Sequence, residues 1–434
     1  MGKSHSKNKN MDKTKNENKE KAPKKAKDNE NKIKEPENKT KDTNTKTNFV
    51  KEILKNSIIH PSKKTKIIKT KTITSKSITC LGLIKDNKIN YLAVGFYDIF
   101  EIYDLENLEV IGRNSTDMNN DCVLNFWQIS NNTFLVAGNT VTIFTFYLED
   151  NNFIMKLLQK IRMENYNYIY MVTSFIFNKN LYIEYDLYEK EKRRKNKKLE
   201  NTEEESEELV INTSKGIFIY TRKKDDLFTV NEREDKFKNN INDQIEKAKK
   251  NPFIYKETLS SEYNYDLVQV NFKYIAASAE KYLGLYSMET SELVTKFNVK
   301  TSHLSYKVLG MLTNDILFVG GGDTISLISI KNFEIILVSL VRVQFKITEI
   351  CILDDFNILL SIKSQQNIDE YLLHYKYNSN IDKLTNKINY NITKLGEELI
   401  TKKESNFTMV SLGLNFVTSV EKKYIQIRDL NLNA

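Results

Sequence analysis

The chain has 434 residues, of which 40% are hydrophobic and 28% are charged, and its formal net charge is +9. Its 22 Phe and 23 Tyr supply enough apolar surface for a folded core, which excludes wholesale disorder. With 13 Gly and 3 Cys, the chain is neither collagen-like nor a disulfide scaffold. The longest apolar run, at 334–343, is about half of what a helix needs to span a bilayer, and the N-terminus lacks the apolar segment of a secretory signal. We therefore expect an intracellular soluble protein with small, buried, reduced cysteines at Cys80, Cys122 and Cys351.

Positive charge is concentrated at the N-terminus. Residues 1–48 contain 15 Lys and 8 acidic residues, a balance of +7, and residues 49–76 contain 8 Lys against Glu52, a further +7. Because the total is +9, residues 77–434 carry −5 (9 − 14). Residues 1–48 hold almost nothing to bury, so we predict a disordered basic arm there, followed by a linker at 49–65.

From residue 66 onward the sequence consists of short alternating or apolar runs, rich in Ile, Val, Tyr, Phe and Thr and broken by Asn, Asp and Gly. Such runs are typical of strands joined by tight turns. One pattern recurs: an apolar strand that ends on a small residue, a turn, an alternating strand, a polar turn and a third strand. Its clearest copies are LAVGFYDIFEIYDLENLEVI at 92–111, FLVAGNTVTIFTFYLEDNNFIM at 134–155, YIAASAEKYLGLYSMETSELV at 274–294 and ILFVGGGDTISLISIKNFEII at 316–336.

The small residue that closes the first strand of each copy measures the repeat. Three spacings are 43, 42 and 41 residues, and the other three, 74, 66 and 58, equal that period plus an insertion. We place charged or polar loop insertions at 189–208 and 231–251, and a milder one near 390–405. A unit of about 40–45 residues with four short strands is typical of a propeller blade. The seven marker residues, which predict seven blades, are Gly95, Gly138, Asn212, Ser278, Gly320, Ser361 and Ser419.

The two ends of the repeat region support this count. The last unit has strands only at 408–412, 415–420 and 424–430, whereas an additional alternating strand, KIIKTKTIT at 66–74, precedes the first full unit. A propeller ring closes when an N-terminal strand joins the C-terminal blade as its fourth strand. The last blade is then complete, with no exposed edge where that strand was missing. The sequence therefore predicts an all-β fold, a single seven-bladed propeller over 66–434 that its N-terminal strand closes.

The repeats resemble the WD-repeat β-propellers. FEIYDLENLEVI at 100–111 and YLGLYSMETSELV at 282–294 look like the third strand, turn and fourth strand of that family. Tyr103-Asp104 and Arg428-Asp429 stand where its Trp-Asp pair falls, while Tyr286-Ser287 and Ser329-Ile330 have lost both members, and the Gly-His pair that opens a repeat is absent. The resemblance implies a propeller that acts as a protein-interaction scaffold.

No catalytic, metal or cofactor site is predicted. The four histidines have no ligand spacing and are scattered over the sequence: His5, His60, His303 and His374. Gly320-Gly321-Gly322-Asp323 falls at a predicted hairpin turn with no helix after it, so it does not fit a phosphate loop. We expect a non-catalytic scaffold that presents its loop rim and insertions to protein partners, whose identity and stoichiometry stay open.

The N-terminal residues MGKSHSK at 1–7 fit the M-G-x-x-x-[ST] pattern of N-myristoylation, with Gly2 as the acylated residue and Ser6 and Lys7 in support. They are similar to the first residues of the myristoylated neuronal calcium sensor proteins. One myristoyl chain binds membranes only marginally, and nearby lysines can supply the second signal. These features predict a cytoplasmic protein held peripherally at an anionic membrane by Gly2 and by Lys7, Lys9, Lys13, Lys15, Lys19, Lys21, Lys24, Lys25 and Lys27.

A second basic cluster lies within the first insertion. It is typical of a nuclear-targeting or nucleic-acid patch, although the acidic residues at 203–205 follow it closely, so a solvated charged loop is the other interpretation. The alternative function is therefore a nuclear or ribosome-assembly factor whose basic arm contacts RNA phosphates. The cluster consists of Lys192, Arg193, Arg194, Lys195, Lys197 and Lys198.

Overall fold

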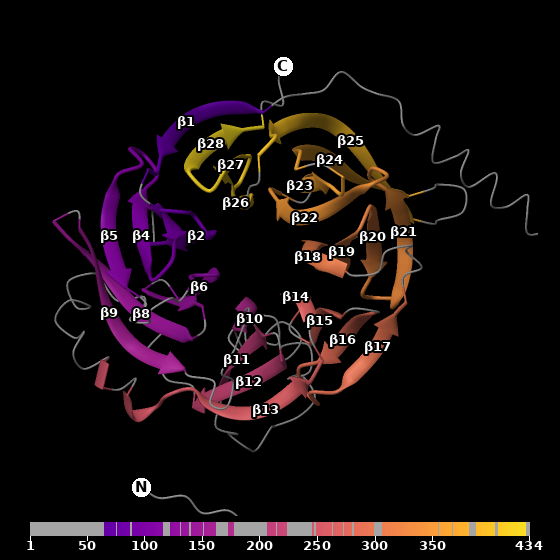
Figure 1. Ribbon diagram of the computed structural model, residues 1–434. Coiled ribbons are helices and arrows are strands. Elements are labelled where there is room, and N and C mark those ends of the chain that lie inside the picture. Colours follow the sequence, from indigo (N-terminus) through magenta and orange to yellow (C-terminus); the bar gives the residue numbers. More distant parts are fainter. Residues whose placement is uncertain are drawn as a thin grey trace, which may run out of the picture. The chain divides into compact units, whose positions relative to one another are not determined.

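The computed structural model describes residues 65–430 except 75, 87–88, 116–121, 131, 139, 151, 162–171, 178–205, 214, 224–244, 247–248, 263, 272, 280–281, 299–305, 355, 367, 382–387 and 404–406. The described strands form seven four-stranded antiparallel sheets arranged in a ring (Figure 1). We number these sheets as blades 1 to 7 in chain order.

Each blade is a meander of four strands. Blade 1 contains β2 (Cys80–Lys85), β3 (Asn90–Gly95), β4 (Ile99–Asp104) and β5 (Val110–Ser115), and blade 2 contains β6 (Asn125–Ser130), β7 (Thr133–Ala137), β8 (Val141–Glu149) and β9 (Asn152–Ile161). Blade 3 contains β10 (Val172–Phe177), β11 (Ser206–Thr213), β12 (Gly216–Lys223) and β13 (Ile254–Ser260), and blade 4 contains β14 (Asn264–Gln269), β15 (Tyr274–Ala279), β16 (Leu283–Ser287) and β17 (Leu293–Phe297). Blade 5 contains β18 (Tyr306–Thr313), β19 (Ile316–Gly321), β20 (Thr324–Ser329) and β21 (Glu334–Leu340), and blade 6 contains β22 (Phe345–Ile352), β23 (Asn357–Ser364), β24 (Glu370–Ile381) and β25 (Ile388–Thr401). Blade 7 contains β26 (Thr408–Leu412), β27 (Asn415–Val420), β28 (Tyr424–Asp429) and β1 (Lys66–Thr72).

The first strand of each blade lies nearest the centre of the ring and the last lies at the perimeter (Figure 1). Every predicted marker residue lies in, or directly follows, the second strand of a blade: Gly95 in β3, Gly138 after β7, Asn212 in β11, Ser278 in β15, Gly320 in β19, Ser361 in β23 and Ser419 in β27. Seven marker residues therefore correspond to seven blades, and the predicted fold is confirmed.

The ring closes where its two ends meet in blade 7. β1 pairs antiparallel with β28, from Lys66 opposite Asp429 to Thr72 opposite Tyr424. The N-terminal strand thus becomes the outer strand of the last blade, as predicted.

A β-bulge recurs at the same place in all seven outer strands. At this place one residue of the outer strand is left without an opposite partner in the neighbouring strand: Ile68 in β1, Ile111 in β5, Leu158 in β9, Lys256 in β13, Val294 in β17, Ile336 in β21 and Leu395 in β25. A second bulge leaves Leu259 unpaired in β13 and Ile400 unpaired in β25. A bulge increases the local twist of a strand. β1 therefore shares this irregularity with the six outer strands that belong to continuous blades.

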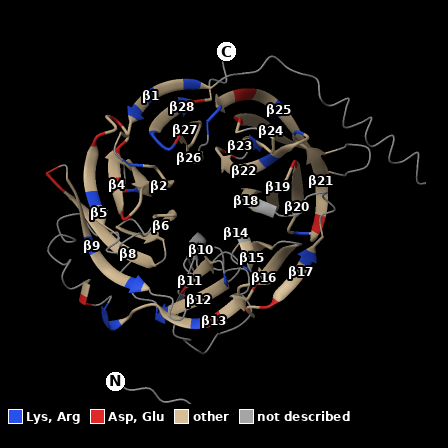
Figure 2. Ribbon diagram, viewed as in Figure 1, with Lys and Arg blue, Asp and Glu red and all other residues tan. Residues whose placement is uncertain are grey.

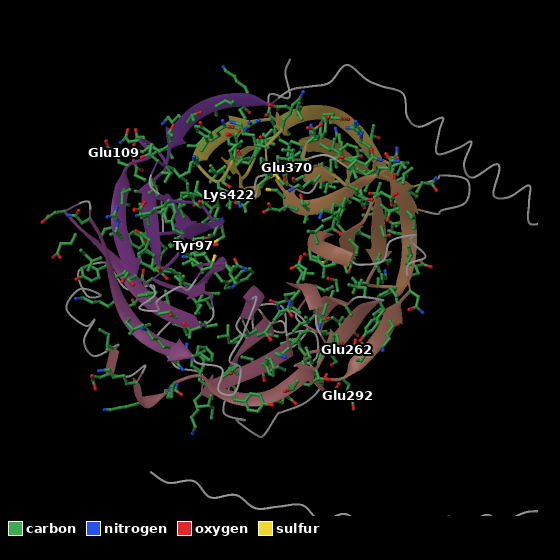
Figure 3. All side chains as sticks on the ribbon, viewed as in Figure 1. Tyr97, Glu109, Glu262, Glu292, Glu370 and Lys422 are labelled. Carbon is green, nitrogen blue, oxygen red and sulfur yellow. The ribbon has the colours of Figure 1, made fainter. Side chains whose placement is uncertain are left out.

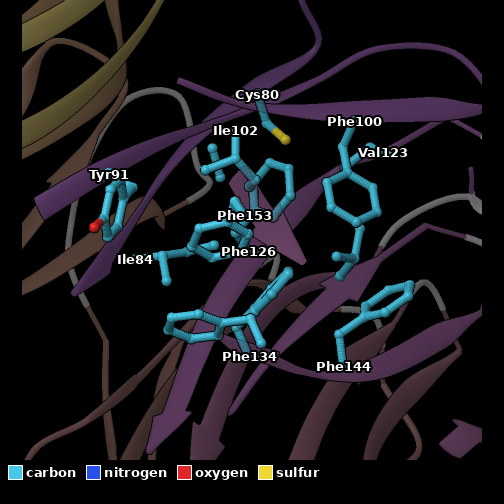
Figure 4. Close-up of a cluster of buried hydrophobic side chains, with 13 residues drawn as sticks. Cys80, Ile84, Tyr91, Phe100, Ile102, Val123, Phe126, Phe134, Phe144 and Phe153 are labelled. Carbon is cyan, nitrogen blue, oxygen red and sulfur yellow. The ribbon is translucent and has the colours of Figure 1, made fainter. Parts of the chain in front are cut away.

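The core lies between neighbouring blades, where facing sheets pack their apolar side chains. Between blades 1 and 2 it is rich in aromatic rings, and Phe100 and Phe134 are completely buried (Figure 4). Phe100 contacts the rings of Phe126, Phe134 and Phe144 at centroid distances of 5.8, 6.0 and 5.4 Å. Such ring pairs add to the stabilisation from buried area.

Three sequence expectations differ from the structure in detail. The milder insertion near 390–405 is not a loop, because residues 388–401 form β25, and the additional length extends the β24–β25 hairpin. The last three residues of the insertion at 189–208 belong to β11, where the register with β12 continues the sheet. Cys80 and Cys351 are buried as expected, but Cys122 is half-buried, because it lies just before β6 rather than within a packed strand.

Candidate protein-interaction surface

The site residues predicted from sequence lie outside the described residues. These are Gly2, Ser6 and the lysines of the basic arm, and the cluster at 192–198. Their roles stay predictions. The topology nevertheless fixes where the two insertions leave the ring, because 178–205 joins β10 to β11 and 224–253 joins β12 to β13. Ser206 pairs with Lys223, so both insertions leave blade 3 from the same end.

A hydrogen-bonded group of polar side chains lies inside blade 6. Ser361 donates to the Glu370 carboxylate (2.9 Å) and is hydrogen-bonded to Thr348 (2.9 Å), and burial raises the pKa of Glu370 (Figure 3). Glu349 accepts a hydrogen bond from the Met409 backbone N–H of blade 7 (3.0 Å). Burial raises its pKa to about 8, and the nearby carboxylates of Glu370 and Asp266 act in the same direction. These contacts join strands and neighbouring blades, which is a structural role.

His374 is also part of the fold. It is buried, and its Nε2 is hydrogen-bonded to Asn357 Oδ1 (2.9 Å). Within the described ranges, no three His, Cys, Asp or Glu side chains are arranged to hold a metal ion, and no helix there is long and apolar enough to cross a membrane.

Charged and aromatic side chains are distributed over the ring without a single dominant cluster. In Figure 3, Tyr97 and Lys422 lie toward the centre of the ring, whereas Glu109 and Glu292 lie at its perimeter. Both Tyr97 and Lys422 belong to turns between the second and third strands of a blade. The outer strands at the perimeter each have an open hydrogen-bonding edge, at which another polypeptide could pair.

The outer strand of blade 5 differs from the other outer strands in lacking basic residues. Each of the other six carries Lys or Arg: Lys66, Lys69 and Lys71 in β1, Arg113 in β5, Lys156 and Lys160 in β9, Lys256 in β13, Lys296 in β17 and Lys394 in β25. Charged side chains on an edge strand, lysine above all, protect it from pairing with other chains. β21 carries only Glu334, at its first position, and Figure 2 shows the rest of the strand without charge.

Apolar side chains are exposed along β21 and just beyond it. Ile335 is 36% exposed, Val338 41%, Leu340 37% and Val343 62%. Isolated exposed apolar residues are ordinary, but a contiguous set on one edge is typical of an interaction site. We name residues 333–343 the blade 5 edge.

An arginine is held in place at one end of the blade 5 edge. The Arg342 guanidinium lies over the rings of Phe345 and Tyr371, 4.1 and 4.7 Å from their centroids, and pairs with Glu397 of β25 (2.5 Å). Lys394 pairs with the same carboxylate, so two cations share one anion. Arginine and aromatic residues in fixed positions are typical of the residues that contribute most to protein interfaces.

The chain resembles known propellers in fold. It resembles a chain in the crystal structure of the mitotic checkpoint complex, with a TM-score of 0.55 and 11% identity over 92% of this chain and 97% of that chain. It also resembles the β-propeller domain of Cps50 (Swd1) from Myceliophteria thermophila, with a TM-score of 0.50 and 12% identity over 84% of this chain and 99% of that domain. No protein-family profile and no curated protein sequence matches the chain. At these identities the likeness shows the fold alone, which is that of a β-propeller.

The blade 5 edge is the feature that sequence reasoning did not assign. The run at 334–343 is the longest apolar run of the chain, and its length alone indicates only that it is too short for a membrane span. A further signal was present, because the run lies at the fourth-strand position of its repeat and contains no basic residue before Arg342. Its exposure follows from the position of that strand at the perimeter.

Proposed function

We propose that the protein is a non-catalytic protein-interaction scaffold that binds protein partners through the blade 5 edge. The observation that carries this proposal is a seven-residue outer strand with exposed apolar side chains and no basic residue, on a ring of seven packed sheets. A rigid ring holds such a strand in one position, which lowers the entropy lost on binding. The resemblance to a propeller chain in a multiprotein complex is consistent with this function.

The proposal is tested by photo-crosslinking in the native host, with p-benzoylphenylalanine at Val338 of the full-length chain. Val294 is the matched control position, since it is a valine of similar exposure, 43% against 41%, on the outer strand of blade 4. We expect protein adducts from position 338 well above those from position 294. Equal yields at the two positions would contradict a contact role for the blade 5 edge.

We further propose that the N-terminus holds the scaffold at an anionic membrane through N-myristoylated Gly2 and the lysines of the basic arm. The exposed Lys66 and Lys69 on β1 extend this positive charge onto the perimeter of blade 7. The test is the intact mass of the N-terminal peptide from the native host, together with membrane fractionation of wild type and Gly2→Ala.

A myristoyl mass increment, with Gly2→Ala in the soluble fraction, is the expected result. A free or acetylated glycine, or a retained methionine, would overturn the lipid anchor. Binding of the arm to RNA with a steep salt dependence would then favour the nuclear or ribosome-assembly alternative.

A further inference from the structure

Exposed apolar residues of β21 flank Ser339 on both sides. Val338 lies directly before it and Leu340 directly after it. When two antiparallel strands are related by a two-fold axis through one residue, positions equally far from that residue face each other. Two copies of β21 would therefore pair Val338 of each copy with Leu340 of the other.

The backbone of β21 has the matching hydrogen-bonding pattern. Val341 N–H donates to Asp323 C=O (2.8 Å), toward the interior of blade 5. Because backbone groups alternate along an antiparallel strand, the N–H and C=O of Val338 and Leu340 point toward the perimeter. Within the described part of the chain, β20 is the only strand paired with β21. A strand that places Leu340 opposite Val338 would thus have hydrogen-bonding groups in register at both residues.

Charge at the two ends of the blade 5 edge favours the same arrangement. Glu334 begins β21, and its exposed carboxylate accepts a hydrogen bond from Asn332 (3.0 Å) but has no cation within ion-pair distance among the described residues. The other end has a positive excess, because Arg342 and Lys394 share the single carboxylate of Glu397. Antiparallel pairing about Ser339 brings the Glu334 end of one copy to the Arg342 end of the other.

We propose that the partner at the blade 5 edge is a second copy of this chain, joined by antiparallel pairing of the two β21 strands about a two-fold axis at Ser339. In this dimer Val338 of each copy faces Leu340 of the other. The perimeter curves away from blade 5 on both sides, so two rings can approach edge to edge (Figure 1). One strand pair lies at the low end of interface sizes, so we expect micromolar affinity. The inference rests on the proposed function, since it names the partner at the same surface.

The first test is sedimentation velocity of the full-length protein over a concentration series, with Val338→Lys and the matched control Val294→Lys. We expect wild type and Val294→Lys to dimerise, and Val338→Lys to weaken the dimer by roughly tenfold or more, because a lysine then enters the strand pair from each copy. A wild type that stays monomeric throughout, or equal weakening by the two variants, would overturn the dimer.

The second test fixes the register. Residues opposite each other in a non-hydrogen-bonded pair have Cα atoms about 4.5 Å apart, which a disulfide can bridge. We expect Ser339→Cys to form a covalent dimer under mild oxidation. Wild type and Thr295→Cys, a half-buried position on β17, should stay at background. Crosslinking of Thr295→Cys as efficient as that of Ser339→Cys would contradict this register.

The two proposals fail in different ways. A monomeric protein whose position 338 photo-crosslinks to other polypeptides would overturn the dimer and keep the scaffold. A monomeric protein without adducts specific to position 338 would overturn both. Self-adducts from position 338, together with a dimer that Val338→Lys weakens, support both.

Discussion

Arg428 and Glu398 form a largely buried ion pair that joins blade 7 to blade 6. Arg428 Nη1 lies 2.9 Å from Glu398 Oε1, and the two side chains are 4% and 19% exposed. Thr65 accepts a hydrogen bond from the same nitrogen (2.9 Å) and donates to Glu398 Oε2 (2.6 Å). The residue directly before β1 is therefore held to the last strand of the chain and to the neighbouring blade.

We expect Arg428→Ala to lower the free energy of unfolding by about 3 kcal/mol, because Glu398 keeps a largely desolvated charge without its partner. Urea unfolding followed by tryptophan fluorescence and circular dichroism measures the change. Arg113→Ala is the control, since Arg113 is mostly exposed and its partner Glu101 keeps Lys76 (2.8 Å). That variant should lose less than about 1 kcal/mol. Equal losses would contradict a special role for Arg428.

Deleting residues 62–76 should abolish cooperative folding, because blade 7 loses β1 and β28 loses its outer partner. Deleting residues 1–48 should leave the unfolding temperature unchanged, because this deletion removes none of the described contacts. Thermal unfolding and size-exclusion chromatography of the two deletions provide the comparison. A soluble, cooperatively unfolding 62–76 deletion would refute the closure as a requirement for folding.

The stability of the ring should fall as the pH rises toward 8. Glu349 has its pKa raised to about 8, so the folded state binds its proton more tightly than the unfolded state does. Its contribution to stability is complete below the unfolded pKa of about 4.5 and is lost as the pH rises through about 8. We expect Glu349→Gln to reduce the loss of unfolding free energy between pH 5 and 9 by on the order of 2 kcal/mol. Thermal unfolding across this range measures it, with exposed Glu334→Gln as the control. Parallel profiles for wild type and Glu349→Gln would contradict the assignment.

The boundary of the first insertion can be tested by two deletions. Removing 189–205 should be tolerated, because β10 and β11 both remain complete. Removing 189–208 should destabilise the fold, because Glu208 is buried and pairs with Lys256 of β13 (2.8 Å). The unfolding temperatures of the two deletion variants, compared with that of wild type, measure the difference. Equal stability would show that the start of β11 contributes nothing to blade 3.

The number of blades and the closure could be predicted because both depend on short-range sequence patterns. The strands expected at 408–412 and 415–420 match β26 and β27 residue for residue. A small residue at the end of the second strand, such as Gly95 or Ser419, leaves a visible period because each repeat needs it at the same place. The isolated strand at 66–74 had one place in the ring, as the fourth strand of a blade that otherwise had three.

Other features depended on contacts between distant residues. The bulges of the outer strands have no residue signature, since the unpaired residue is Ile68 in one blade and Lys256 in another. The pair between Arg428 and Glu398 joins two different repeats. The exposure of the blade 5 edge does not follow from its composition, because an apolar strand at the perimeter has the same composition as one in the core. It follows from the fourth-strand position of the run in its repeat.

The equivalence of β1 to the other outer strands bears on which blade the polypeptide has to begin in. The bulge at Ile68 matches those of the six other outer strands, and Lys66 lies opposite Asp429 at the junction. The ring therefore does not depend on beginning in blade 7. A circular permutant that links residue 430 to residue 65 through a short peptide, and opens the chain at 116–121 between β5 and β6, should fold into the same ring. Any of the seven blade junctions could then serve as the point at which the polypeptide begins.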